Sequence, residues 1–183
     1  MAIRPDLKWA IKFGEFKVPS SPATLWVGGS PMGISTGSFS GSYIDGLATN
    51  LPYTPYDWQY SIDYTVEGCS GKTVLGIAME NHKGPTEPFV DKGMVTILAF
   101  PCYAVLFKGP NDETAPFDTT GTYSVGTVLV PGKVTVGSVS YAVWKPATTG
   151  VTTPDTAGYG VVLALDSTTT PNMMVVWFSP VLV

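Results

Sequence analysis

The chain has 183 residues, of which 44% are hydrophobic and 13% are charged, and its formal net charge is −4. A chain of this length and apolar content can bury a substantial core, so we expect a folded domain, with or without an appended arm, rather than disorder. Contacts with nucleic-acid phosphates need clustered Lys and Arg. No basic run occurs here, which argues against nucleic acid as the main partner.

Membrane insertion and metal binding are not expected either. There is no run of about 18 apolar residues that could form a membrane-spanning helix, and residues 1–16 lack the apolar centre of a signal peptide. We therefore expect synthesis in a cytoplasm. Cys69 and Cys102 are the two cysteines, and their spacing fits no zinc site. Buried or half-buried free thiols are expected, because disulfides are rare in reducing compartments.

The first 50 residues predict an extended N-terminal arm. From Trp9 to Phe13 the apolar residues are spaced by two, which favours an arm or an edge strand over residues 1 to about 20. A helix capped by Asp6 is the alternative. Residues 28–50 are rich in Gly and Ser, which predicts a surface loop or a segment ordered by something outside the chain. We therefore divide the chain into an arm and Gly/Ser-rich segment, 1–50, and a β-barrel domain, 51–183.

Residues 52–60 concentrate aromatic side chains. Aromatic rings near polar groups can stack on sugar rings, so Tyr53, Tyr56, Trp58 and Tyr60 are candidate sugar-stacking residues. In an all-β domain, such clusters more often plug a barrel end or form a subunit contact. We favour packing or an interface over sugar binding.

The remainder of the chain predicts an all-β fold, a compact β-barrel or β-sandwich with long loops. Strands are expected over 60–66, 72–79, 160–165 and 173–178, the last two covered on both faces because they are almost continuously apolar. The run 93–108 should divide or bend at Pro101, which cannot donate a ladder hydrogen bond. Pro131 and Gly132 predict a tight hairpin turn. Residues 145–158 and 166–172 are expected to form a loop and a polar turn.

Residues able to do chemistry are scarce. His82 is the only histidine and lies in a polar turn, where a surface histidine is expected. A serine triad would have to be built on His82 alone, and the acidic residues show no spacing that selects a hydrolytic pair. The Gly-Lys-Thr at 71–73 lacks the upstream glycine of a phosphate loop. No catalytic, cofactor-binding or metal-binding residue is predicted, and the protein is not expected to be an enzyme.

The order of elements resembles that of a known group. A strand ending in Gly-Ile-Ala-Met at 76–79 is followed by Val-Thr-Ile-Leu at 95–98, then by a Tyr-x-x-Gly-x-x-Leu segment starting at Tyr123 that leads into Gly132-Lys-Val-Thr. Gly-Val-Val-Leu at 160–163 and a closing strand follow. Over residues 60–183 this order is similar to that of the small β-barrel capsid decoration, or cement, proteins of tailed bacteriophages.

That resemblance implies a structural virion protein on the outer surface of a phage head, made in the host cytoplasm. Its partner would be the major capsid protein, and it would form a homotrimer on the shell, with no nucleic acid, membrane or cofactor involved. Apolar contacts to the shell are expected from the first part of the chain, with Trp9, Phe13, Phe16 and Trp26 as candidates. The alternative is a carbohydrate-binding β-sandwich module of a fibre or receptor-binding protein.

Overall fold

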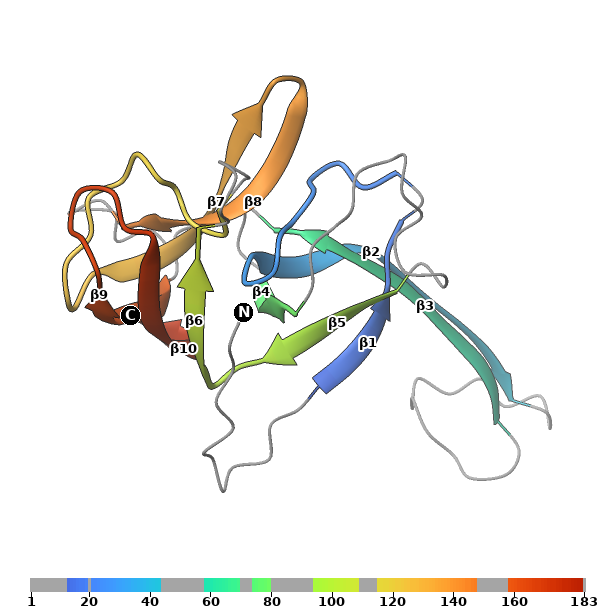
Figure 1. Cartoon of the computed structure of the whole chain (residues 1–183). Helices are drawn as coiled ribbons and strands as arrows, with labels where there is room; N and C mark the ends of the chain where they lie inside the picture. Colours follow the sequence, from blue (N-terminus) through green and yellow to red (C-terminus); the bar gives the residue numbers. More distant parts are fainter. Residues whose placement is uncertain are drawn as a thin grey trace.

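A computed structural model describes residues 13–19, 21–43, 58–69, 74–79, 94–108, 115–147 and 158–182. These residues form ten strands in two antiparallel five-stranded sheets, shown in Figure 1. They contain no helix, and therefore none long and apolar enough to cross a membrane. The predicted all-β fold class is confirmed.

Sheet A has the order β1-β5-β4-β2-β3 and sheet B the order β6-β10-β9-β7-β8. Sheet A consists of β1 (Phe13–Lys17), β2 (Pro31–Tyr43), β3 (Trp58–Gly68), β4 (Val74–Ala78) and β5 (Met94–Ala99). Sheet B consists of β6 (Cys102–Phe107), β7 (Val128–Val136), β8 (Val139–Pro146), β9 (Gly158–Leu165) and β10 (Met173–Leu182). The chain thus completes sheet A, β1 to β5, before it begins sheet B, β6 to β10.

Sheet A curls into a half-barrel. Its two outermost strands, β1 and β3, lie close to each other although they stand at opposite ends of the strand order. The curled sheet surrounds a core of fully or almost fully buried side chains: Trp26, Met32, Val66, Ala78, Val95 and Ile97. Phe16, Val18 and Leu75 pack against this core from its margin.

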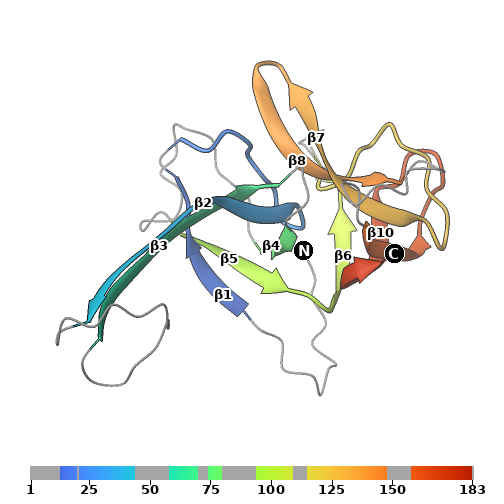
Figure 2. The ribbon, with the colours of Figure 1, turned by 180° about the vertical axis from the view of Figure 1, so that it is seen from behind.

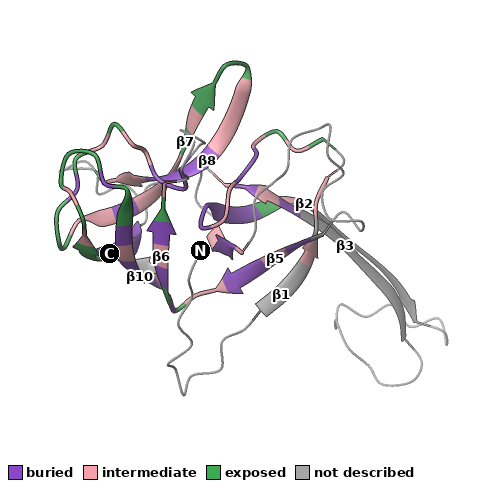
Figure 3. Cartoon of the chain, viewed as in Figure 1, coloured by how far each residue is buried: buried purple, intermediate pink, exposed green. Residues whose placement is uncertain are grey.

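A second and larger core joins the two sheets. Ile77 and Leu98 of sheet A belong to the same buried cluster as Leu106, Trp144 and Phe178 of sheet B. Successive residues of a strand point to opposite faces, so β4 and β5 serve both cores, one face each. Figure 3 shows the buried residues gathered toward the centre of the molecule, where the sheets meet. The two sheets therefore share one buried core.

The outer edge of β8 is covered by two short segments. Leu25 N donates to Ser140 O at 2.8 Å, and Ala142 N donates to Leu25 O at 2.9 Å. Further along, Trp144 N donates to Pro116 O at 2.8 Å. An uncovered strand edge invites pairing with other chains, so these bonds protect β8 and also tie the start of sheet A to sheet B.

The edge strand allowed for the first part of the chain is present at Phe13–Lys17, because β1 pairs with β5 along its whole length and lies at the end of sheet A. The loop or externally ordered segment expected over residues 28–50 is wrong over Pro31–Tyr43, because these residues form β2, which pairs with β3 along most of its length. The glycines of β2 face large residues of β3, with Gly37 opposite Tyr64 and Gly41 opposite Tyr60. Residues 1–12 and 44–50 lie outside the described residues.

The predicted tight turn at Pro131 and Gly132 is wrong. Both residues lie inside β7, where Pro131 is the register partner of Trp144. The hairpin turns instead after Val136, at Gly137, whose φ is 62°. Glycine adopts this left-handed conformation without steric cost.

Pro131 is tolerated in β7 because no ladder hydrogen bond is needed from its nitrogen. Trp144, its partner, directs its own N–H and C=O away from β7, to Pro116 and Asp118. In an antiparallel pair, opposite residues point their backbone groups the same way relative to the ladder, either both inward or both outward. The nitrogen of Pro131 therefore faces away from β8, and β9 pairs with β7 only as far as Leu129.

The other strand predictions are largely confirmed. β3, β4, β9 and β10 match the predicted runs, and the run 93–108 divides into β5 and β6 around the cis Phe100-Pro101 bond. The expectation that β9 and β10 are covered on both faces is wrong at one end, because Leu163 and Met173 are exposed. The polar turn between them is confirmed: Asp166 Oδ1 accepts hydrogen bonds from Asn172 N and Met173 N.

Candidate functional site

The candidate shell-contact residues from the first part of the chain differ in where the structure places them. Trp26 is fully buried in the core of the half-barrel, so its selection as a contact residue is wrong. Phe16 is half-buried against the same core, and Phe13 is the register partner of Leu98 in β5. Trp9 lies outside the described residues. Phe16 and Trp26, the two of these residues whose burial the structure describes, therefore lie against or in the core of the half-barrel.

The candidate sugar-stacking residues are partly brought together. Trp58 and Tyr60 lie in β3, with Trp58 opposite Tyr43 in the register with β2. Residues two apart on a strand share a face, so Trp58, Tyr60 and Tyr43 occupy one face of the β2–β3 pair. Tyr53 and Tyr56 lie outside the described residues.

Sheet B carries an apolar outer face that the sequence analysis did not find. Tyr103 and Phe107 on β6 and Met173 on β10 are 41%, 40% and 39% exposed. The register places Phe107 opposite Met173 and Tyr103 opposite Trp177, and the rings of Tyr103 and Trp177 lie 4.4 Å apart between centroids. We call this the sheet B outer face; its residues alternate along two paired strands and are Tyr103, Val105, Phe107, Met173, Val175 and Trp177.

The sheet B outer face was missed for a physical reason. A continuous apolar run indicates a strand with two apolar faces, but it cannot show whether both faces are covered. Leu163, at the irregularity in the register of β9 with β10, is exposed beside this face. Exposed apolar groups that adjoin one another in this way are typical of interaction sites.

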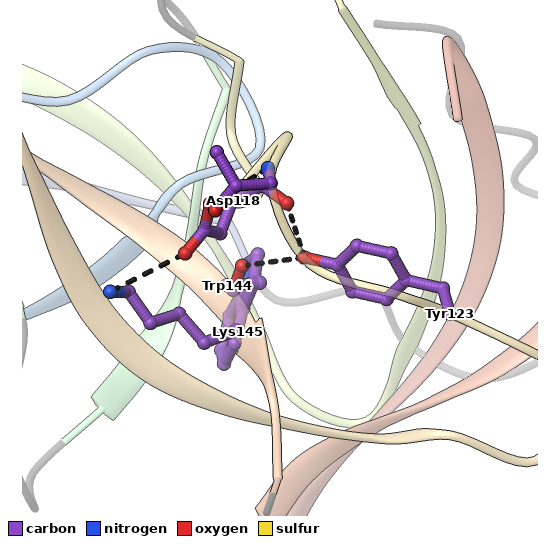
Figure 4. Close-up of polar contacts among 5 residues, drawn as sticks. Asp118, Tyr123, Trp144 and Lys145 are labelled. Atoms are coloured by element: carbon purple, nitrogen blue, oxygen red, sulfur yellow. Dashed lines mark hydrogen bonds and ion pairs between the residues drawn. The ribbon is translucent and has the colours of Figure 1, made fainter. Parts of the chain in front are cut away.

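The best-defined polar cluster centres on Asp118, shown in Figure 4. Lys145 Nζ lies 3.4 Å from Asp118 Oδ2, while the backbone N and the Oγ1 of Thr120 donate to Asp118 Oδ1 at 3.0 and 2.7 Å. Tyr123 Oη donates to Asp118 O at 2.8 Å and, more weakly, to Trp144 O at 3.4 Å. The cluster fastens the loop 116–123 to β8.

The electrostatics of this cluster fit a structural role. Burial raises the pKa of the Tyr123 phenol above its ordinary value, and the charge of Asp118 raises it further. The phenol therefore stays protonated and keeps its donor role. For Asp118, partial burial alone would raise the pKa, but the Thr120 hydrogen bonds and the Lys145 ammonium outweigh it and lower the pKa. The Asp118 carboxylate therefore stays ionised and keeps its contacts with Thr120 and Lys145.

Replacing Asp118 with asparagine is expected to lower the free energy of unfolding by about 1 kcal/mol at pH 7, the usual size of a half-exposed charged contact. Because folding lowers the pKa of Asp118, its contribution is present above the ordinary carboxyl pKa of about 4 and is lost as pH falls below it. Urea denaturation at pH 7, 5 and 3 should show the two proteins converging at the lowest pH. A difference that stays constant over this range would contradict the assignment.

The cysteines are not arranged for chemistry. Cys102 is buried, and burial raises the pKa of its thiol to about 12. Since the thiolate is the reactive form, Cys102 is an inert core residue. Cys69 is half-buried, and the two are not joined in a disulfide, which confirms the expected thiols. His82 lies outside the described residues.

Within the described ranges, no three His, Cys, Asp or Glu side chains gather as metal ligands would. The surface that stands out in the described part of the chain is therefore the sheet B outer face. Neither a known protein family, nor a curated protein, nor a solved structure matches the chain significantly.

Proposed function

We propose that the protein is a capsid decoration protein, which binds the outer surface of a phage head and stabilises contacts between major capsid subunits. The observation that carries the proposal is the sheet B outer face, an apolar strip on a well-packed all-β body. The resemblance of residues 60–183 to such proteins supports the same role.

The physics of decoration suits this surface. A protein that binds only the assembled shell stabilises it by mass action, and the effect is multiplied when many copies bind. Such a protein needs contact area rather than catalysis. Large apolar side chains, above all aromatic ones, supply most of the energy at protein interfaces. None of the six residues of the sheet B outer face is charged, so docking through it should depend only weakly on salt.

Co-sedimentation with empty capsids tests the proposal. Replacing Tyr103 and Phe107 with serine should weaken shell binding by at least about tenfold, because two exposed apolar contacts are removed from the interface. The matched control replaces Val125 and Val136 with serine; they are 67% and 56% exposed and belong to neither β6 nor β10. Equal binding of the two variants would contradict docking through the sheet B outer face, and no sedimentation of the wild type would contradict the function.

The same assay tests the N-terminal arm. Removal of residues 1 to about 20 would also delete β1, which pairs with β5, and so would confuse lost binding with lost folding. Truncation should stop at residue 12. We expect the shortened chain to keep its fold and to bind the shell more weakly; undiminished binding would rule out Trp9 and its neighbours as contacts.

The second candidate function is carbohydrate binding. It is favoured by one observation: Trp58 and Tyr60 are two residues apart on β3, and Trp58 pairs with Tyr43 of β2, as a stacking platform requires. Titration with host polysaccharide should then give a binding signal that disappears in Trp58→Ala. A signal of equal size in both proteins would exclude this platform.

A further inference from the structure

β6 is the end strand of sheet B. It pairs with β10 and with no other strand in the described part of the chain, and Figures 1 and 2 show β10 beside it on one side. At the opposite end of the same sheet, the backbone of Leu25 and of Pro116 covers the edge of β8. Among the described residues, no backbone segment covers the edge of β6 in this way.

The backbone groups of alternate β6 residues point outward from this edge. Lys108 N donates to Asn172 O at 2.7 Å, which continues the register of β6 with β10. In an antiparallel pair, alternate residues bond to the partner strand and the residues between them point away from it. Tyr103, Val105 and Phe107 therefore direct their N–H and C=O groups outward, where no described residue bonds to them.

The same three residues form the β6 part of the sheet B outer face. Successive residues of a strand point their side chains to opposite faces. Tyr103 and Phe107 are exposed, whereas the residues that alternate with them are buried in the shared core: Cys102, Ala104 and Leu106. Tyr103, Val105 and Phe107 thus offer outward backbone groups in the plane of the sheet and apolar side chains on its outer face.

The edge of β6 carries none of the usual protection against strand pairing. Proteins protect a free strand edge with charged side chains, proline or a bulge. The strand Cys102–Phe107 contains no charged residue and no proline, and its register with β10 is regular throughout. An edge of this kind is suited to strand addition, in which an extended peptide joins a sheet through backbone hydrogen bonds.

We propose that β6 binds an extended segment of the major capsid protein, which joins sheet B as an additional strand. This inference rests on the proposed decoration function and specifies how the partner is held. Backbone groups of the segment bond to those of Tyr103, Val105 and Phe107, and every second side chain of the segment extends the sheet B outer face. Docking on the outer face alone would leave these backbone groups in water.

The chemistry of β6 defines the segment that fits. The segment is about as long as β6, and its residues opposite Tyr103, Val105 and Phe107 are aromatic or β-branched, because such cross-strand pairs are the most favourable partners for an apolar strand face. None of these residues is proline, since each must donate a ladder hydrogen bond. Charged residues are excluded from the same positions, because the three β6 side chains that they would face carry no charge.

Val105→Pro tests the edge, because it removes the central outward N–H and keeps an apolar side chain. The nitrogen of Val105 points away from β10, so proline is tolerated there, as Pro131 is in β7. We expect co-sedimentation with empty capsids to weaken by at least about tenfold, the usual effect of one lost hydrogen bond whose partner stays buried. The urea midpoint should stay close to that of the wild type.

Two comparison variants separate the backbone from the side chain. Val105→Ala keeps the N–H and shortens the side chain, so it should weaken shell binding less than Val105→Pro. Thr135→Pro makes the same backbone change on β7, where the partner Ser140 directs its C=O away to Leu25, and should bind as the wild type does. If Val105→Pro binds as well as Thr135→Pro, strand addition is wrong and decoration stands. If the wild type does not sediment with capsids, both are wrong.

Hydrogen exchange tests the edge without any substitution. In the free wild-type protein, the amides of Ala104 and Leu106, which bond to β10, should exchange at least about tenfold more slowly than those of Tyr103, Val105 and Phe107. On capsids these three amides should slow by at least about tenfold. If they stay fast on capsids, the protein docks without strand addition. If they are already slow in the free protein, the chain itself or a second copy covers β6, and the proposal is overturned.

Discussion

Replacing Trp144 with alanine is expected to lower the free energy of unfolding by about 3–5 kcal/mol, the usual cost of removing a large buried aromatic side chain. Trp144 is fully buried in the core that joins the sheets. Its ring lies 4.8 Å from that of Phe178 between centroids. Its Nε1 donates to Gly29 O at 2.8 Å, so one side chain on β8 holds the segment that leads into β2.

A matched variant separates packing from hydrogen bonding at this site. Trp144→Phe keeps much of the apolar ring but leaves the buried carbonyl of Gly29 without its donor, which should cost about 1–3 kcal/mol. Urea denaturation gives both values from the midpoint and slope. A loss below about 1 kcal/mol for Trp144→Ala would show that this residue does not join the two sheets.

Gly76→Ala is expected to destabilise the protein by about 3 kcal/mol or more, which exceeds an ordinary overpacking cost. A Cβ atom at Gly76 would clash with the backbone carbonyl oxygen of Leu98, and would lie 2.9 Å from the carbonyl carbon of Leu98 and 2.7 Å from Ile97 Cγ2. Gly76 pairs with Ala99, next to these residues in β5. The clash can be relieved only by moving β4 away from β5, which would break the ladder inside sheet A.

The control for Gly76→Ala is Gly137→Asn at the tip of the β7–β8 hairpin. A Cβ at Gly137 meets no atom within 4 Å, and asparagine tolerates the left-handed conformation better than most residues. Its effect on the unfolding free energy should stay within about 0.5 kcal/mol, as for other surface changes. Comparable losses in the two variants, measured by urea denaturation, would argue against the close approach of β4 to β5.

Features that depend on local chemistry could be predicted from the sequence. The strands β9 and β10 follow from apolar runs bounded by turn residues, and Pro101 divides β5 from β6 because proline lacks a ladder donor. Pro131 shows the limit of such reasoning. Pro131 lies inside β7 although Pro101 ends a strand. The nitrogen of Pro131 faces away from β8 because its partner Trp144 directs its backbone groups outward, and the local sequence does not contain that information.

The surfaces were harder to predict than the strands. Trp26 was predicted to contact the shell because it is a large aromatic residue in the first part of the chain, but it is buried in the core that sheet A surrounds. The exposure of Tyr103 and Phe107 depends on what covers the second face of sheet B. No pattern within a single strand contains that information.

The amino-acid sequence by itself determined that this is an all-β protein with low charge, and where most of its strands begin and end, because alternation, apolar runs and proline act within a few residues. Only the tertiary structure decided that the Gly/Ser-rich stretch contains a strand, that Trp26 is core, and that sheet B presents an apolar outer face. Those features depend on register and packing between segments far apart in the chain. A shift in register by one residue would turn every side chain of a strand to the opposite face.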